Sequence, residues 1–370
     1  MPTRILFATG VFPPLLGGPA TITNRLAREL TKSGYQCTVL TFGNRNSGAL
    51  PFQVKRVSYR IPQPFRGFLM MLKTIQEARS ADIIYAFDTY TSGYAAAIAA
   101  RLLKKPLLVR FTGDAAWEQA YADGRTSLDI LSFQKNPPRT RSFRMRRFIL
   151  NTANLVVTDC IFLKNVLSAM GISDSKVRVI NNATDQHEQA LIESNTIIAM
   201  GRLVKWKGVE ALIRVFPKVK KHIPNAALVI AGTGPEEQHL QTIAKKISPD
   251  DILFTGAIFG KEKNTCFNNA GVFVLNTFYE GMSNTLLEAM AYGLPIITTN
   301  AGANEELIQH EANGIVINYN DQDALARGLI ELLSNKNKAR QLGNSARNES
   351  QRYDWEQFVK QNKKIIEELL

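Results

Sequence analysis

The sequence predicts an α/β protein with two domains, each built on a doubly wound parallel sheet. Short apolar runs of strand type alternate with segments of helical spacing along the chain, which is the pattern of parallel strands joined by crossover helices. The 370 residues suffice for two domains of ordinary size, each with its own core. A polar stretch over residues 185–195 separates two series of strands. We therefore expect an N-terminal domain over 1–185, a C-terminal domain over 186–352, and a closing helix over 353–370.

Six apolar runs in the first half are expected to form strands: 4–9, 37–42, 82–87, 107–111, 155–158 and 177–180. The segment 20–33 has helical spacing and stops at Gly34. Gly17 and Gly18 lie between the first strand and this helix, where a glycine pair lets the backbone approach a ligand closely. A plain tight turn explains the pair about as well. The loop is not GxGxxG, so the dinucleotide fingerprint is missing.

Six further runs are expected to form the sheet of the second half: 196–200, 226–231, 252–255, 271–275, 295–299 and 314–317. The predicted strand 271–275 precedes residues 278–290, the stretch around which the second domain is organised. Gly281 supplies a turn, and Ser283 is a suitable N-cap for a helix with an apolar face.

The start of that helix is predicted to bind an anion. The N–H groups of Asn284, Thr285 and Leu286 would point out of the helix, where the macrodipole favours a phosphate. Glu280 and Glu288 flank this point, and carboxylates would repel a phosphate, so they fit better as acceptors for the hydroxyls of a sugar or a ribose. A phosphate site with a carboxylate on either side indicates a nucleotide-sugar site. The alternative is an ordinary strand–helix unit with two surface glutamates.

Two cations follow the first strand of the second domain. Arg202 and Lys207, within residues 201–208, leave a strand end before a helix that starts near Val209. Arginine offers a planar fork and lysine a point charge, a suitable pair for a diphosphate leaving group. The alternative is two surface cations in a turn.

Glu280-x7-Glu288, followed by residues 289–297 (AMAYGLPII), resembles the signature of the retaining, GT-B-fold glycosyltransferases of the large glycogen-synthase-like group (family 4, glycosyl transferases group 1). This resemblance implies two Rossmann-like domains that face a cleft, with the donor held mainly by the C-terminal domain and the N-terminal domain on the acceptor side. It also implies that the closing helix over 353–370 packs back on the N-terminal domain. It implies catalytic roles for Arg202, Lys207, Glu280 and Asp114. The implied donor-binding residues are Gly18, Arg202, Lys207, Ile258, Glu280, Gly281, Met282, Ser283, Asn284, Thr285, Leu286 and Glu288.

Asp114 lies in a loop that departs from the pattern of the resembled family. It follows a glycine at a predicted strand end, the usual place for ligands in open α/β sheets. Many members of the resembled family have a histidine in this loop, and this sequence has none. Its motif Gly-Asp-x-x-Trp-Glu resembles that of one subgroup of these enzymes. We expect Asp114 to bind an acceptor hydroxyl or act as a weak base, with a helix N-cap as the alternative.

No metal and no cofactor is expected. The four histidines (His187, His222, His239 and His310) are isolated in the sequence, without an HExxH motif. Asp321-Gln322-Asp323 has an Asp-x-Asp form, but it opens a predicted helix, where acidic residues complement the dipole. We interpret it as structural.

The net charge of +13 is concentrated in the first half. Residues 1–185 hold 25 Lys and Arg against 11 Asp and Glu, whereas residues 186–370 hold 20 against 21. Such asymmetry suggests an anionic partner. Two segments combine cations with large apolar residues, 64–73 and 139–148. Without a recognisable nucleic-acid motif nearby, we expect an anionic membrane surface rather than nucleic acid. The alternative is a solvated helix face over the core.

We expect transfer of a hexosyl unit, with retention, from a nucleoside diphosphate sugar to a lipid-linked or saccharide acceptor in cell-surface polysaccharide or glycolipid synthesis. A UDP-sugar is the favoured donor, and GDP-mannose is the second choice. The alternatives are a GT-B nucleotide-sugar epimerase or hydrolase, and a non-catalytic nucleotide-sugar or membrane-binding protein. The chain runs directly into a strand, so no signal peptide is expected, and three scattered cysteines suit a reducing compartment. We expect a cytoplasmic protein, at most peripheral on the inner face of the plasma membrane.

Overall fold

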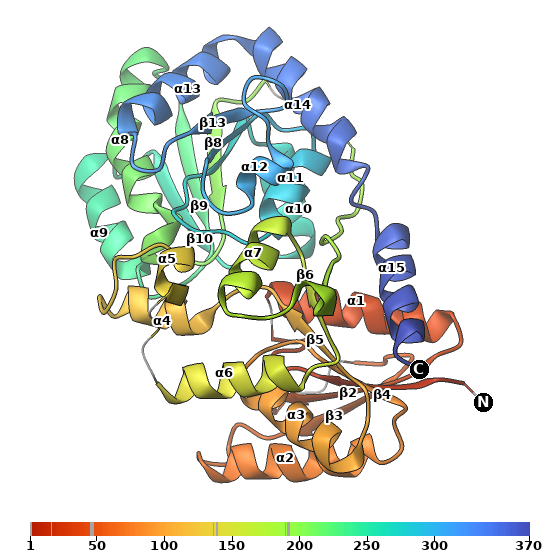
Figure 1. Cartoon of the computed structure of the whole chain (residues 1–370). Helices are drawn as coiled ribbons and strands as arrows, with labels where there is room; N and C mark the ends of the chain where they lie inside the picture. Colours follow the sequence, from red (N-terminus) through yellow and green to blue (C-terminus); the bar gives the residue numbers. More distant parts are fainter. Residues whose placement is uncertain are drawn as a thin grey trace. The chain divides into compact units, whose positions relative to one another are not determined.

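The computed structural model describes residues 2–15, 17–44, 48–135, 137, 140–188, 190 and 193–370. The chain divides into two compact units. Unit 1 comprises the residues up to Asn182 together with Glu356–Leu370, and unit 2 comprises Ala183–Trp355. Each unit holds one parallel sheet flanked by helices (Figure 1). The prediction of two parallel-sheet α/β domains is therefore confirmed.

The sheet of unit 1 has seven strands in the order β3-β2-β1-β4-β5-β6-β7. They are β1 (Arg4–Ala8), β2 (Gln36–Phe42), β3 (Gln53–Val57), β4 (Ile83–Ala86), β5 (Leu107–Phe111), β6 (Leu155–Thr158) and β7 (Val177–Val179). Because β1 pairs with β2 on one side and with β4 on the other, the direction of winding reverses between β1 and β4. The ends of β1 and β4 thus form the topological switch point of unit 1.

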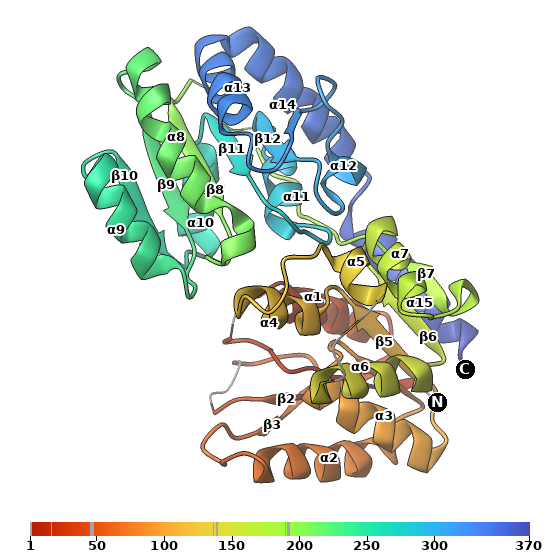
Figure 2. The same ribbon diagram turned by 60° about the vertical axis from the view of Figure 1, so that its left-hand side comes forward.

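The helices of unit 1 are α1 (Gly18–Lys32), α2 (Phe65–Ala78), α3 (Thr91–Leu103), α4 (Ala115–Ala122), α5 (Ile130–Lys135), α6 (Arg141–Thr152), α7 (Ile161–Ala169), the 3-10 turn η1 (Asp174–Lys176) and α15 (Trp355–Glu368). Helices α2, α3 and α6 form a layer on one face of the sheet, and α1 lies on the opposite face (Figures 1 and 2). Strands such as β4 and β5 are consequently buried on both faces, which explains why they read as continuous apolar runs.

Helix α15 belongs to unit 1 although it follows all of unit 2 in the sequence. The hydroxyl of Tyr85 in β4 donates to Asn362 Oδ1 at 2.9 Å. The guanidinium of Arg110 in β5 lies 5.2 Å from the centroid of the Phe358 ring. Both Tyr85 and Arg110 are buried, so the last helix completes the core of the first unit.

Strand β3 was not predicted. Its sequence, QVKRV, holds two adjacent cations and no apolar run. The strand is nonetheless paired with β2, in a register that places Val54 opposite Val39. It forms an edge of the sheet, where charged side chains are typical because they discourage pairing with another chain. An edge strand of this kind carries little of the hydrophobic pattern on which the prediction depended.

The sheet of unit 2 has six strands in the order β10-β9-β8-β11-β12-β13. They are β8 (Thr196–Met200), β9 (Ala227–Ala231), β10 (Ile252–Gly256), β11 (Val272–Leu275), β12 (Ile296–Thr299) and β13 (Ile315–Ile317). Its helical elements are η2 (Lys205–Lys207), α8 (Val209–His222), α9 (Glu237–Ile247), α10 (Gly260–Asn268), α11 (Asn284–Ala291), α12 (Asn304–Leu307), α13 (Gln322–Ser334) and α14 (Lys336–Ser350). Here the winding reverses between β8 and β11.

The Asp-x-Asp sequence has a structural role, as predicted. Asp321 is the N-cap of α13, and its carboxylate accepts the Ala324 N–H at 2.8 Å. Asp323 is paired with Lys218 of α8 at 2.8 Å. Within the part of the chain that the structure describes, no helix is long and apolar enough to cross a membrane.

Candidate functional site

Most of the predicted donor residues of unit 2 lie in or directly after the two loops where its winding reverses. The loop after β8 carries Arg202 and Lys207, and the loop after β11 carries Glu280 and Ser283. Because β8 and β11 are neighbouring parallel strands, their carboxyl ends meet at one edge of the sheet. This is the place where open α/β sheets bind ligands.

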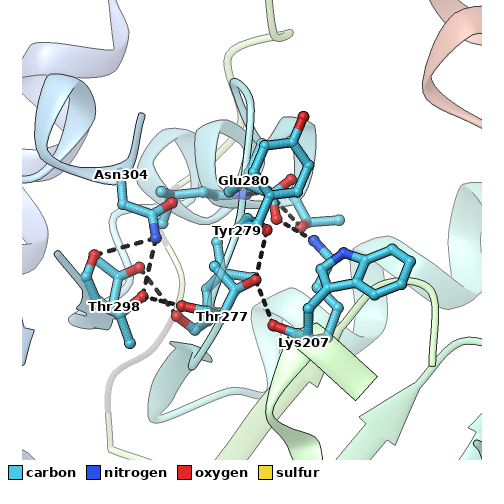
Figure 3. A network of polar contacts seen from close by, with 12 residues as sticks. Lys207, Thr277, Tyr279, Glu280, Thr298 and Asn304 are labelled. Carbon is cyan, nitrogen blue, oxygen red and sulfur yellow. Dashed lines mark hydrogen bonds and ion pairs between the residues drawn. The ribbon is translucent and has the colours of Figure 1, made fainter. Parts of the chain in front are cut away.

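Hydrogen bonds hold the two loops together. The N–H of Phe278 donates to the Trp206 carbonyl at 2.7 Å, and the Asn276 amide donates to the Gly208 carbonyl at 3.0 Å. The Thr277 hydroxyl lies 2.9 Å from the Trp206 carbonyl. The cation-bearing loop therefore has a fixed position against the loop that carries Glu280 (Figure 3).

A second set of contacts supports Glu280 from the other side. The N–H of Ala303 donates to the Glu280 carbonyl at 3.1 Å. The Asn304 amide lies 3.2 Å from the Thr299 carbonyl, and the Thr299 hydroxyl donates to the Thr277 carbonyl at 2.6 Å (Figure 3). Sequence analysis missed these supporting residues, because a single threonine at a strand end carries no distinctive signal.

Gly208 has no room for a side chain. Its φ is 59°, and an added Cβ would lie 2.1 Å from the Asn276 carbonyl oxygen. We expect Gly208→Ala to lower the free energy of unfolding by about 3 kcal/mol or more, since strain and a collision add. Gly260→Ala is the matched control, because Gly260 has a φ of 52° with open space around it. Chemical denaturation should show a cost of about 1–2 kcal/mol for the control; equal costs would contradict the collision.

Lys207 and Glu280 form an ion pair with each other. Lys207 Nζ donates to Glu280 Oε2, and the two side chains are only 16% and 15% exposed. Sequence analysis assigned Lys207 to the diphosphate and Glu280 to hydroxyls of the sugar or ribose, and it did not predict that the two side chains pair with each other. Arg202 lies with its guanidinium 5.3 Å from the Trp206 ring centroid, and both Arg202 and Lys207 line one small pocket. Gly281, which follows Glu280 in the sequence, is partly exposed.

The predicted helix start is confirmed. Ser283 is the N-cap of α11, and its Oγ accepts the Leu286 N–H at 3.4 Å. The expectation that the Leu286 N–H points out toward an anion is therefore corrected, since the cap takes it. The first two N–H groups, of Asn284 and Thr285, have no partner within the helix and suit an anion. Met282, just before the cap, is buried.

Glu288 also has a lysine partner. Lys263 Nζ in α10 donates to Glu288 Oε1 at 2.6 Å. Burial and the Glu288 carboxylate raise the pKa of Tyr292 to about 12. Ile258 lies in the loop between β10 and α10, partly exposed. Each of the two carboxylates that flank the start of α11 is therefore neutralised by its own lysine.

His187, which looked isolated in the sequence, lies beside this second pair. Its ring stacks on Tyr292 with a centroid distance of 4.1 Å and an interplanar angle of 7°. Tyr292 stacks in turn on Phe267 at 4.9 Å. Burial lowers the pKa of His187 from its ordinary 6.5. The negative charges of Asp185 and Glu288 act in the opposite direction but do not cancel the effect of burial.

This shift predicts a pH-dependent contribution to stability. Because the folded state lowers the pKa of His187, the unfolded chain takes up a proton first as the pH falls below 6.5, and unfolding becomes easier. His187→Phe keeps an aromatic ring on Tyr292 but does not titrate. We expect the melting temperature of the native protein to fall relative to that of His187→Phe between about pH 8 and about pH 5. A difference that does not change with pH would contradict the assignment.

Two predicted site residues lie in unit 1. Gly18 is the first residue of α1 and is partly exposed. Asp114 is completely buried: it is the N-cap of α4, its Oδ1 accepts the Ala116 N–H at 3.0 Å, and its Oδ2 is paired with Arg146. Gln134 donates to the same Oδ2 at 2.8 Å. The expectation that Asp114 binds an acceptor hydroxyl or acts as a weak base is thus corrected in favour of the N-cap alternative.

Asp88 occupies the switch point of unit 1 and was missed by sequence analysis. Its carboxylate accepts N–H groups from Gly10 at 2.9 Å, from Tyr90 at 2.8 Å and from Gly93 at 3.0 Å. Burial raises the pKa of Asp88, and these backbone donors oppose the rise. The residue joins the loops that follow β1 and β4. A lone aspartate after an apolar run gives no signal of this role. Among the described residues, no group of three or more His, Cys, Asp and Glu side chains is arranged to hold a metal.

Two family models match successive parts of the chain. Residues 16–188 match the model described as Glycosyltransferase Family 4, and residues 182–349 match the one described as Glycosyl transferases group 1. The chain is 23% identical to an uncharacterized glycosyltransferase of Methanocaldococcus jannaschii, over 97% of this chain and 96% of the relative. It is also 31% identical, over 42% of each chain, to a GDP-mannose-dependent alpha-(1-6)-phosphatidylinositol monomannoside mannosyltransferase of Mycobacterium tuberculosis.

Among solved structures, the chain resembles HepE of Anabaena in complex with UDP. The TM-score is 0.79 at 19% sequence identity, over 99% of this chain and 100% of the other. This likeness identifies the fold as the GT-B type, with two parallel-sheet α/β domains.

Proposed function

We propose that this chain, whose two halves match glycosyltransferase family models, moves a hexosyl unit from a nucleoside diphosphate sugar to a lipid-linked or saccharide acceptor. The product would serve cell-surface polysaccharide or glycolipid synthesis, and the anomeric configuration would be retained, as in family 4. A UDP-sugar is the favoured donor, supported by the UDP complex of the Anabaena protein. GDP-mannose is the second choice, supported by the mycobacterial mannosyltransferase, which also suggests a lipid acceptor.

The observation that carries this proposal is the Lys207–Glu280 ion pair beside the start of α11. A diphosphate bound at the N–H groups of Asn284 and Thr285 would draw Lys207 toward its oxygens. Glu280 would then be released to accept hydroxyls of the donor sugar. The site would thus exchange one ion pair for two contacts with the donor, and neither charge would remain buried without a partner.

The chemistry requires stabilisation of the departing diphosphate above all. Arg202, Lys207 and the first N–H groups of α11 would place positive charge where the negative charge develops. Because these groups belong to the protein, we propose that transfer needs no divalent metal, and activity in the presence of EDTA tests this. Glu288, positioned by Lys263, would accept the ribose hydroxyls. The Ile258 loop would complete the donor site of unit 2, and unit 1 would bind the acceptor. The donor-binding role of Gly18 stays a prediction from the resemblance. Asp114 has no role in this scheme.

The ion-pair exchange predicts opposite effects for one substitution. Glu280→Gln frees Lys207 from its partner while leaving the side-chain shape intact. We expect the nucleoside diphosphate to bind several-fold more tightly, in line with about 1 kcal/mol for the lost competition. We expect kcat/KM for transfer to fall about ten- to a hundredfold, since a charged acceptor for the sugar is lost. Calorimetry and a steady-state assay measure the two quantities. Weaker diphosphate binding by the variant would contradict the exchange.

A thermal-shift screen against UDP-, GDP-, ADP- and dTDP-sugars tests the donor assignment. One nucleotide should stabilise the native protein, and Glu288→Ala should remove most of that shift, because a ribose contact is lost. Asp323→Ala, in an ion pair on the surface of α13, is the control and should keep the shift. If no donor changes the melting temperature at millimolar concentration, the donor site as described is wrong.

Product analysis separates transfer from the alternatives. A transferase should release the nucleoside diphosphate only when an acceptor extract is present, and NMR of the product should show retention. Release without acceptor would indicate a hydrolase, and conversion of the sugar without release would indicate an epimerase. A purely binding protein would give neither product.

A further inference from the structure

Helix α2 exposes large apolar side chains in a single stripe. Phe65 is 68% exposed, Phe68 is 58% exposed and Leu72 is 46% exposed. The spacing i, i+3, i+7 places all three on one side of the helix. The opposite side packs into unit 1 through the buried Met70 and Ala78. An ordinary surface helix would carry polar residues where this stripe lies.

Cations lie near the N-terminal end of the stripe. Arg60 precedes α2 and Arg66 lies in its first turn, where the Arg66 guanidinium is 5.1 Å from the centroid of the Tyr59 ring. Helices α2, α3 and α6 form one layer over the sheet of unit 1 (Figure 2). At the far side of this layer, α6 exposes three arginines: Arg141, Arg144 and Arg147. We call the outward surface of these three helices the basic face.

Negative charge is almost absent from the basic face. Glu77 is the one acidic residue in α2, α3 and α6, and its carboxylate lies 2.7 Å from Lys55 Nζ. The cations of α6 thus have no acidic neighbour on their own layer. A surface with this charge is complementary to a dense array of anions.

The segment 139–148 contributes to this surface differently from the sequence expectation. Arg139 lies outside the described residues, and Arg146 is buried against Asp114. The Phe148 ring packs on Tyr94 of α3, with a centroid distance of 5.4 Å. The aromatics of α6 are therefore half-buried in the layer and the helix offers only charge. The apolar anchor is on α2.

We propose that the basic face binds the surface of an anionic lipid bilayer. Phe65, Phe68 and Leu72 enter the boundary between headgroups and acyl chains, and the arginines contact anionic headgroups. This combination of an apolar stripe with nearby cations is what an interfacial helix requires. A second copy of the chain would bring one basic face against another, and like charges oppose that contact. A nucleic acid would satisfy the arginines but leave Leu72 without an apolar partner. The surface lies wholly within unit 1 and does not depend on the donor site.

Vesicle sedimentation tests this with the full chain. The native protein should sediment with phosphatidylcholine vesicles that contain about one-third phosphatidylglycerol, and should remain in solution with pure phosphatidylcholine. Binding should weaken as salt is raised to about 0.5 M, because the Debye length shortens.

Two triple variants separate the apolar and the charged contributions. Phe65→Ser, Phe68→Ser and Leu72→Ser together should reduce binding at least about tenfold. Arg141→Gln, Arg144→Gln and Arg147→Gln should reduce it about a hundredfold, since each cation near an anionic surface contributes about a factor of five. Because all six side chains are outward-facing, the melting temperature should stay close to that of the native protein.

Matched controls lie on other elements. Leu128, Ile161 and Leu253 are 51%, 59% and 59% exposed, and their triple replacement by serine should leave vesicle binding unchanged. Replacement of the exposed Lys221, Lys245 and Lys246 of unit 2 by glutamine is the charge control. Binding that survives in both basic-face variants, or equal loss in the controls, overturns the proposal. So does failure of the native protein to bind anionic vesicles, concentration-dependent dimers that the α2 variant abolishes, or tighter binding to DNA than to vesicles at equal salt.

Discussion

Lys207→Ala is expected to lower kcat/KM for sugar transfer by at least about a thousandfold. Removal of one preorganised charge at a developing anion typically costs a factor of 10²–10³. Here the loss is compounded, because Glu280 would keep its negative charge beside the incoming diphosphate without its partner. A steady-state assay with the donor identified in the thermal-shift screen measures the effect.

Lys205→Ala is the matched control for this experiment. Lys205 lies on the same 3-10 turn, two residues earlier, and its side chain is exposed. We expect activity within about twofold of the native protein, because exposed charges contribute little. Similar losses in both variants would show that the turn as a whole is sensitive. Full activity in Lys207→Ala would exclude Lys207 from leaving-group stabilisation.

Phe358→Ala is expected to destabilise unit 1 by about 3–5 kcal/mol, although residue 358 is remote in sequence from the rest of that unit. Phe358 is 2% exposed, and its ring faces the guanidinium of Arg110. Arg110 is itself 2% exposed; its Nη2 donates to the Ile180 carbonyl at 3.2 Å and to Asn182 Oδ1 at 2.8 Å. Its Nε and Nη1 have no hydrogen-bond partner among the described residues, so the ring compensates part of the buried charge.

Hydrogen exchange resolves which unit is affected. The amides of β4 and β5 should lose protection in Phe358→Ala, while those of β8 and β11 keep theirs, because Glu356–Leu370 belong to unit 1. Phe259→Ala removes a phenyl group that is 44% exposed and should cost less than about 1 kcal/mol. A cost below about 1 kcal/mol for Phe358→Ala would show that α15 is not part of the unit 1 core.

Hydrophobic periodicity predicted the strands of both sheets with one exception. Buried parallel strands such as β11, with the sequence VFVL, are continuous apolar runs, unlike a surface segment, and Gly271 marks where β11 begins. Strand β3 was missed because its pairing with β2 comes from backbone hydrogen bonds, which every residue can make. The N-cap at Ser283 was predicted because capping is local and depends on residues three apart. The helix start at Asp321 was predicted because acidic residues complement the helix dipole there.

The contacts that define the site could not be predicted in this way. Lys207 and Glu280 are 73 residues apart, and Asp114 and Arg146 are 32 apart. Sequence patterns identify residue types suited to a ligand, but they do not show whether such residues already have partners in the folded chain. Asp114 already has such a partner in Arg146, which is why it does not fit the expected role as an acceptor ligand or base. For His187, isolation in the sequence concealed a stacked position beside Glu288.

The placement of α15 also affects how the protein is made. Unit 2 is one continuous segment, Ala183–Trp355, so all of its residues have been synthesised before Glu356–Leu370 emerge from the ribosome. Until then β4 and β5 lack the helix that covers Tyr85 and Arg110. Domains usually fold in the order of synthesis. In this protein unit 1 cannot be complete until the last helix has been made, although most of its chain is synthesised first.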